Sequence, residues 1–172
     1  MGNRVISVIF AVALILGFQP FAMAAEAQED PVDVIVEYRE GEFLSQEKDM
    51  IAVRQARATV DLSDGSSSFT VGVLKGDETY TTDTYEITKT TIDIGLQSIQ
   101  GSSPYIKVTL YKSTGVSVAE KTVALPASYP TQVGGTVHIK FTNLNTSTKY
   151  YAIIENLDTN VTGNILGLTK QA

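Results

Sequence analysis

The sequence predicts an all-β protein: an antiparallel β-sandwich of jelly-roll or immunoglobulin-like type, with about eight strands and an N-terminal extension. Three observations predict this class. From residue 58 onward, Thr, Ser, Val and Ile dominate, short runs alternate apolar with polar residues, and Gly, Asp and Asn separate the runs. The Cys and Trp that mark true immunoglobulin domains are absent, so the sequence leaves the choice between the two sandwich types open.

Residues 1–24 have the order of a secretory signal peptide. A basic start at residues 1–4 precedes the apolar run 5–16, and Ala22-Met23-Ala24 forms a small-residue cleavage site. The apolar run is too short for a good membrane span, and no later stretch is long enough for one. We therefore expect cleavage after Ala24 and a secreted or cell-envelope protein without a transmembrane segment. An uncleaved N-terminal anchor is the alternative.

The composition excludes several classes of function. The formal net charge is −6, and removal of the signal peptide, which carries one Arg and no acid, makes it −7. An acidic protein is a poor candidate for binding nucleic acid or anionic lipid, because both are negatively charged. The chain has no cysteine, which excludes disulfides, thiol catalysis and thiolate metal sites.

Residues 25–57 form an N-terminal extension that precedes the sandwich domain, residues 58–172. Within the extension, residues 32–38 alternate apolar and polar positions, which predicts an extra strand. Residues 42–58 fit either a short helix capped by Ser45 or a linker. The extra strand would pack on the edge of its own domain, or it would add to the sheet of a neighbouring subunit.

Alternation and turn residues place the strands of the sandwich domain in order. The expected strands are residues 58–62, 69–73, 85–88, 91–96, 105–111, 116–125, 137–141, 150–155 and 161–168. Turn signals between them include Asp64-Gly65, Gly76-Asp77-Glu78, Ser113-Thr114-Gly115 and Asn143-Leu144-Asn145-Thr146. Residues 150–155 are apolar at both alternating positions, so we expect a central strand that is covered on both faces.

The strand at residues 105–111 has the most regular alternation. The set expected to face the core is Ile106, Val108 and Leu110. The set expected to face solvent, and the candidate ligand-binding residues, are Tyr105, Lys107, Thr109 and Tyr111. Tyrosine offers a flat apolar ring with a polar tip, which suits stacking on sugar rings or anchoring a protein interface.

Other tyrosines lie near loops that would surround this face; they are Tyr80, Tyr85 and Tyr129. The alternative interpretation assigns all of these tyrosines to cross-strand packing or to the core, because tyrosine is common in strands.

Residues suited to catalysis are few. The single histidine, His138, lies on the polar side of its strand beside Lys140, where we expect a surface residue, and no Gly-x-Ser-x-Gly elbow is present. Glu86, Asp93 and Glu155 are strand-borne acids that a glycoside hydrolase could use. Without Trp to line a sugar-binding cleft, they are expected to be solvated acids, and the protein is expected not to be an enzyme.

Calcium is the one cofactor that the sequence accommodates, because aspartates gather in its turns. The candidate ligands are Asp61, Asp64, Asp77, Asp83 and Asp158. None has EF-hand spacing, and each is also explained by the habit of aspartate to start turns by bonding its own backbone. The main expectation is therefore that no cofactor is bound.

The leading hypothesis is an exported, non-enzymatic β-sandwich that binds a glycan or a protein at the cell surface or in the envelope. In composition and strand pattern alone, residues 58–172 resemble the small all-β accessory and adhesion-type domains that bacteria export. No motif assigns a family. The alternative is a structural subunit that forms homo-oligomers by pairing through residues 32–38. A hydrolase that uses the strand-borne carboxylates is the third hypothesis.

Overall fold

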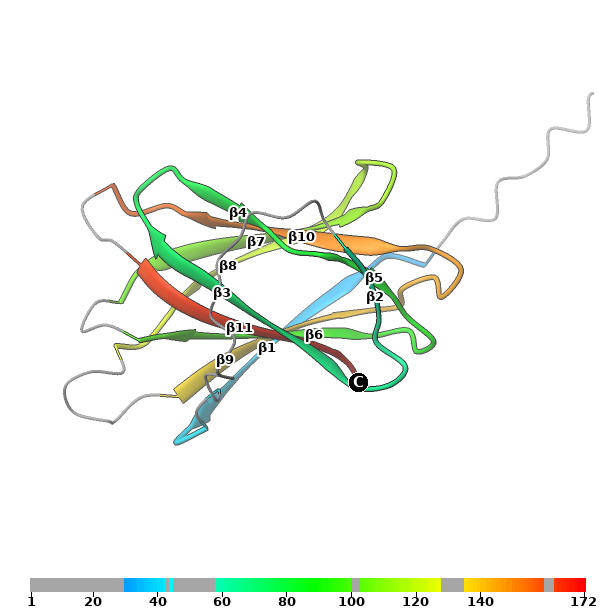
Figure 1. The fold of residues 1–172 in the computed structure, drawn as a ribbon, viewed down its shortest axis with the longest axis horizontal. Helices are drawn as coiled ribbons and strands as arrows, with labels where there is room; N and C mark the ends of the chain where they lie inside the picture. The colour runs from blue at the N-terminus through cyan, green and yellow to red at the C-terminus, as the bar shows by residue number, and fades with distance from the viewer. Residues whose placement is uncertain (1–29, 43, 45–57, 100–102, 128–134, 160–162) are drawn as a thin grey trace, which may run out of the picture.

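The computed structural model describes residues 30–42, 44, 58–99, 103–127, 135–159 and 163–172 (Figure 1). In this part of the chain the protein is a sandwich of two β-sheets without a helix, which confirms the predicted class. Among the same residues, no helix is long and apolar enough to cross a membrane. The predicted signal peptide and the ambiguous segment at residues 45–57 lie outside the described residues.

The strands are β1 (Asp33–Glu40), β2 (Thr59–Asp61), β3 (Ser66–Leu74), β4 (Thr79–Thr81), β5 (Thr84–Glu86), β6 (Ile92–Ser98), β7 (Tyr105–Lys112), β8 (Ser117–Ala124), β9 (Gly135–Thr142), β10 (Tyr150–Asn156) and β11 (Gly163–Gln171). The first sheet has the order β1-β9-β6-β11-β3. The second has the order β2-β5-β10-β7-β8, with β4 also paired to β10. All pairs are antiparallel except β2 with β5.

The strand order is that of a jelly roll. From β3 onward, the chain crosses between the sheets at every connection except β4 to β5 and β7 to β8. Early strands consequently pair with late ones: β3 with β11, β4 and β5 with β10, and β6 with β9, around the β7–β8 hairpin. Such nested pairing distinguishes a jelly roll from an immunoglobulin-like sandwich. This order resolves the choice that the sequence left open.

The sandwich domain has more strands than the sequence predicted. The segment around residues 79–86 forms two short strands, β4 and β5, because Thr82 and Asp83 interrupt the pairing with β10. Thr82 turns inward at this break, where its hydroxyl accepts a hydrogen bond from the Ala152 amide at 2.9 Å. The interruption is therefore a bonded kink in one jelly-roll strand.

The hydrophobic core lies between the two sheets. The residues of β7 predicted to face inward, Ile106, Val108 and Leu110, are fully buried, which confirms that prediction. The largest fully buried side chains include Tyr85, Tyr150 and Phe141. Strand β10 is central, as predicted, but it is buried on its core face only; its other face is half-buried.

Strand β6, in contrast, is buried on both faces along its whole length. Its second face is covered where the chain leaves β1 and returns across the first sheet at Glu42 and Leu44. The Thr136 hydroxyl donates to the Glu42 carbonyl at 2.8 Å, and the Leu44 amide donates to Gln97 Oε1 at 2.8 Å. These two bonds fix the returning segment on the side of the sheet away from the core.

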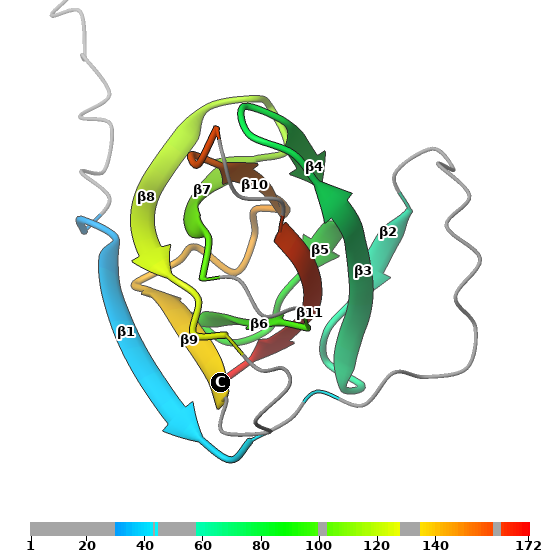
Figure 2. The same ribbon diagram turned by 90° about the vertical axis from the view of Figure 1, so that its left-hand side faces the viewer.

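The predicted extra strand belongs to the sandwich itself. Strand β1 pairs with β9 over its full length, from Asp33 opposite Thr142 to Glu40 opposite Gly135. It lies at the edge of the first sheet, next to β8 at the edge of the second (Figure 2). The described strand of the N-terminal extension thus packs on its own domain, as in one of the two predicted arrangements.

Gly167 of β11 gives a test of the packing between β3 and β11. A Cβ atom added there would lie 2.1 Å from the ring of Phe69, which also stacks on Tyr80 at 5.6 Å between ring centroids. We expect Gly167→Ala to lower the free energy of unfolding by about 1–3 kcal/mol, because the ring must move. In a Phe69→Ala background, the same change should cost much less. Urea denaturation of the four proteins in this cycle measures both costs, and equal costs would contradict the contact.

Candidate functional site

Two groups of polar side chains lie on the outer surfaces of the sheets, the surfaces that face away from the core. The first is the tyrosine face of the second sheet: Tyr105, Lys107, Thr109 and Tyr111 of β7 with Tyr151 and Glu155 of β10. The second is a buried charged network on the first sheet, centred on His138. The sequence analysis proposed the first group and missed the second.

The tyrosine face arises from the register between β7 and β10, which places Tyr111 opposite Tyr151 and Lys107 opposite Glu155. The two tyrosine rings stack with centroids 5.3 Å apart and an angle of 9° between planes. Lys107 Nζ lies 2.5 Å from Glu155 Oε2, and this hydrogen bond raises the pKa of Lys107. The face therefore presents an aromatic pair and an ion pair side by side.

Exposure differs along the tyrosine face. Tyr105 is 55% exposed, whereas Thr109 is only 6% exposed. Lys107 and Tyr111 are half-buried beside their partners on β10. The four residues share one face as predicted, but Thr109 has little surface to offer a ligand. Tyr105 is held by its backbone, since its amide donates to Asp158 Oδ2 at 2.8 Å.

The other tyrosines do not surround this face as a group. Tyr85 is a core residue: Thr169 donates to its hydroxyl at 3.2 Å, and burial raises its pKa to about 12. Its interpretation as part of a binding rim is wrong, because its strand turns that position inward. Tyr80 stacks on Phe69, and Tyr129 lies outside the described residues.

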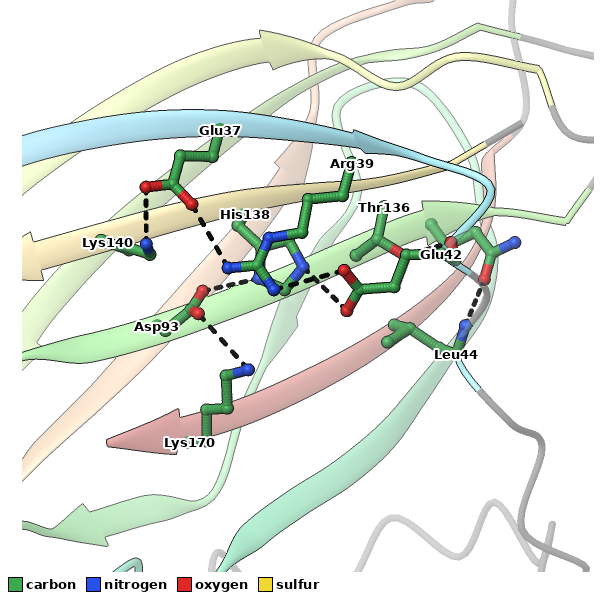
Figure 3. A network of polar contacts seen from close by, with 10 residues as sticks. Glu37, Arg39, Glu42, Leu44, Asp93, Thr136, His138, Lys140 and Lys170 are labelled. Carbon is green, nitrogen blue, oxygen red and sulfur yellow. Dashed lines mark hydrogen bonds and ion pairs between the residues drawn. The ribbon is translucent and has the colours of Figure 1, made fainter. Parts of the chain in front are cut away.

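His138 lies at the centre of the buried charged network and is fully buried, so its interpretation as a surface residue is wrong (Figure 3). Its Nδ1 lies 2.9 Å from Asp93 Oδ1, and its Nε2 lies 3.2 Å from Glu42 Oε1. Gly95 faces the ring across the sheet, and a Cβ atom there would lie 3.3 Å from His138 Cε1. The missing side chain at Gly95 thus makes room for the imidazole.

The network continues outward through β1. Arg39 donates to Glu42 at 3.3 Å and to Glu37 at 3.3 Å, and Lys140 donates to Glu37 at 2.6 Å (Figure 3). Burial tends to raise the pKa of Glu42, but the charges of His138 and Arg39 outweigh it, so the pKa is lowered from its ordinary value. The hydrogen bond from Lys140 likewise lowers the pKa of Glu37. The network consequently holds these glutamates in the ionised form.

At the inner end, Asp93 is almost completely buried and its Oδ2 has no hydrogen-bond partner among the described residues. Lys170 Nζ is 3.8 Å from that oxygen, close enough for charge attraction. Asp93 is therefore compensated by His138 on one oxygen and by Lys170 on the other. An aspartate and a glycine inside an otherwise apolar strand were the sequence signal for this arrangement.

The imidazole at the centre of the buried network is enclosed. Carboxylates occupy both ring nitrogens of His138, which has no exposed surface. The acids considered for glycoside hydrolysis also lie apart: Asp93 is on the first sheet, while Glu86 and Glu155 are on the second and pair with Lys149 and Lys107. In the part of the chain described, no two of these three carboxylates lie on the same strand, and none lies opposite another in the strand register.

The aspartates considered for calcium act in turns where contacts are described. Asp61 accepts from the Ser63 amide, and Asp83 accepts from the Ala58 amide. Asp77 adopts a positive φ of 63°, as turn aspartates do. Asp64 lies in the turn before β3, and Asp158 bonds the start of β7. Within the described ranges, no group of three His, Asp or Glu side chains is placed to hold a metal ion.

An apolar groove of about 550 Å³ opens between the two edge strands β1 and β8. Its apolar lining is Val36, Tyr38, Val123, Leu125, Pro126 and Val137. Both edges lie on the same side of the sandwich, as Figure 2 shows. Three residues of the core, Val123, Leu125 and Val137, therefore form part of the groove wall.

No protein-family model and no curated protein matches the sequence. Among solved structures, a family GH115 4-O-methyl-α-glucuronidase with specificity for decorated arabinogalactans aligns over 76% of this chain and 20% of its own, with 10% identity and a TM-score of 0.41. The VP2 subviral particle of infectious bursal disease virus aligns over 84% and 38%, with 10% identity and a TM-score of 0.22. The chain spans well under half the length of either protein, and neither likeness informs its function.

The buried network predicts that Asp93→Ala lowers the free energy of unfolding much more than Glu86→Ala does. Asp93→Ala should lower the free energy of unfolding by about 2–5 kcal/mol, because it leaves His138 and Lys170 without their buried partner. Glu86→Ala breaks only an exposed ion pair with Lys149 and should cost no more than about 1 kcal/mol. Urea denaturation at neutral pH measures both, and a small cost for Asp93→Ala would mean that the pairing contributes little.

The network also predicts a loss of stability in acid. Because the folded pKa values of Glu37 and Glu42 lie below their ordinary value of 4.5, their contribution is complete above that pH and is lost as the pH falls below it. The urea midpoint should therefore decrease as the pH is lowered from about 5 to about 3. Glu42→Gln should make this decrease shallower, whereas Glu120→Gln, an exposed change outside the network, should not.

Proposed function

We propose that this protein is an exported, non-enzymatic binding module that contacts a glycan or a protein through the tyrosine face of its second sheet. The observation that carries the proposal is the combination on that face: an exposed Tyr105, a stacked Tyr111–Tyr151 pair and a Lys107–Glu155 ion pair. Aromatic rings supply contact area, and the charged pair beside them supplies directed hydrogen bonds.

The length of the tyrosine face favours an extended ligand. Tyr105 and Tyr111 lie six positions apart on one strand, which corresponds to roughly 20 Å at the rise of a β-strand. The groups along this row follow the sheet surface and do not converge into a pocket, as they would for a small molecule. A polysaccharide chain fits this arrangement best, and a flat protein surface is the second candidate.

Two features support a non-enzymatic role. The only histidine of the chain is enclosed between Asp93 and Glu42, and the strand-borne acids are each paired with a basic side chain. The order of residues 1–24 supports export, because it is the order of a cleavable signal peptide.

Binding is tested by affinity gel electrophoresis against a panel of soluble polysaccharides. Tyr105→Ala and Lys107→Ala should each weaken binding at least about tenfold, a loss of about 1.4 kcal/mol. The matched control is Lys121→Ala, which removes an exposed lysine from β8, outside the tyrosine face. The melting temperature of the Tyr105 variant should stay close to that of the wild type, since more than half of this side chain is in solvent.

Binding of a polysaccharide that all three variants retain would contradict the proposed face. If no polysaccharide in the panel binds, the glycan form of the proposal fails, and the protein form is tested by the same variants in pull-downs from cell-surface extracts.

A further inference from the structure

Strand β1 is a long and regular edge of the first sheet. It is eight residues long and contains no proline. Its pairing with β9 runs through Asp33–Glu40 without a register shift. Only β9 pairs with it among the described strands, so no described strand lies hydrogen-bonded to its other side. Natural proteins usually shorten, bend or cover such an edge, because an open strand is a template for another strand.

The same strand exposes apolar side chains. Of the seven large apolar side chains exposed in the described residues, β1 holds three: Ile35 at 48%, Val36 at 40% and Tyr38 at 50%. Val36 and Tyr38 lie opposite Ile139 and Val137 of β9, so they point to the core side of the sheet. They line the apolar groove between β1 and β8 and are exposed there. A concentration of exposed apolar residues on an open edge marks an interaction surface.

We propose that β1 pairs antiparallel with β1 of a second copy of this chain, so that the first sheets of two copies join into one. The two-fold axis passes through Val36, which then lies opposite the partner's Val36. Val34 lies opposite the partner's Tyr38, on the side of the groove. On the outer side, Asp33 lies opposite the partner's Arg39.

The side-chain pattern selects this register. Opposite residues of an antiparallel pair point to the same face of the sheet. If the two-fold axis passes through a residue, the apolar side of one β1 strand continues into the apolar side of the other. An axis between two residues would instead place apolar side chains opposite polar ones. With the axis at Val36, opposite charges meet at both ends of the pairing. Moving it to Glu37 places two Glu37 side chains opposite each other. Moving it to Ile35 places Asp33 opposite the partner's Glu37, again with like charges.

The partner is a second copy because β1 is complementary to itself. Its apolar residues Val34, Val36 and Tyr38 match one another across the axis, and Asp33 near its start matches Arg39 near its end. An interface of this kind is isologous, so it closes as a dimer and does not extend into a fibre. The tyrosine face belongs to the other sheet, so the dimer and the proposed ligand are tested independently.

Cysteine cross-linking tests the register directly, because the chain contains no cysteine. Val36→Cys should form a covalent dimer under mild oxidation, since residues at the axis have Cα atoms close enough for a disulfide. The matched control is Val73→Cys on β3, at the opposite edge of the same sheet, where the valine is 57% exposed. Ile35→Cys mixed with Glu37→Cys should give the mixed dimer faster than either variant gives its own.

Light scattering gives the second test. The wild-type protein should show a mass that rises from monomer to dimer with concentration. Val36→Lys should remain a monomer over the same range, because it places two ammonium groups at the axis, whereas Val73→Lys should behave as the wild type. A wild-type monomer at all concentrations, together with cross-linking of Val36→Cys no faster than of Val73→Cys, would overturn the proposal. Circular dichroism confirms that each variant is folded.

Discussion

The contact of His138 with Asp93 and Glu42 is the constraint on which the first sheet depends. Strand β6 of this sheet is buried on both faces, so the charge that it carries on its second face needs a partner, because unpaired buried charge is costly. Here one imidazole bonds Asp93 below it and Glu42 above it. Glu42 belongs to the segment that follows β1, so the same contact that compensates Asp93 also ties the N-terminal strand to its sheet. Arg39 and Lys140 extend that compensation to the surface.

This arrangement explains why one side of the sandwich stays open. The returning segment at Glu42 and Leu44 covers the outer face of the first sheet, so it is unavailable to close the side between β1 and β8. Val36 and Tyr38 consequently point toward the core and still meet solvent. The chain thus satisfies its buried charges and leaves apolar surface at one edge. An edge of this composition is stabilised when another strand covers it.

The sequence predicted those features that depend on neighbouring residues. Alternation correctly divided Ile106, Val108 and Leu110 from the opposite set, and it placed β1 as an extra strand. It could not show which second faces become covered, since this depends on segments far away in the chain. His138 shows the limit: its polar-side position was correct, but Glu42, 96 residues away, encloses it. The inward position of Tyr85 was missed for a related reason, because the side to which it points is set by the pairing of β5 with β10, more than 60 residues away in the chain.

The position of β11 has a consequence for the order of folding. Strand β11 lies between β6 and β3 in the interior of the first sheet, so until β11 has paired, β3 lacks its partner among the described strands and β6 has only β9. A growing polypeptide that lacks residues 163–171 therefore cannot assemble the five-stranded sheet. Because pairings between residues distant in the sequence are slow to form, we expect the first sheet to be completed late in folding.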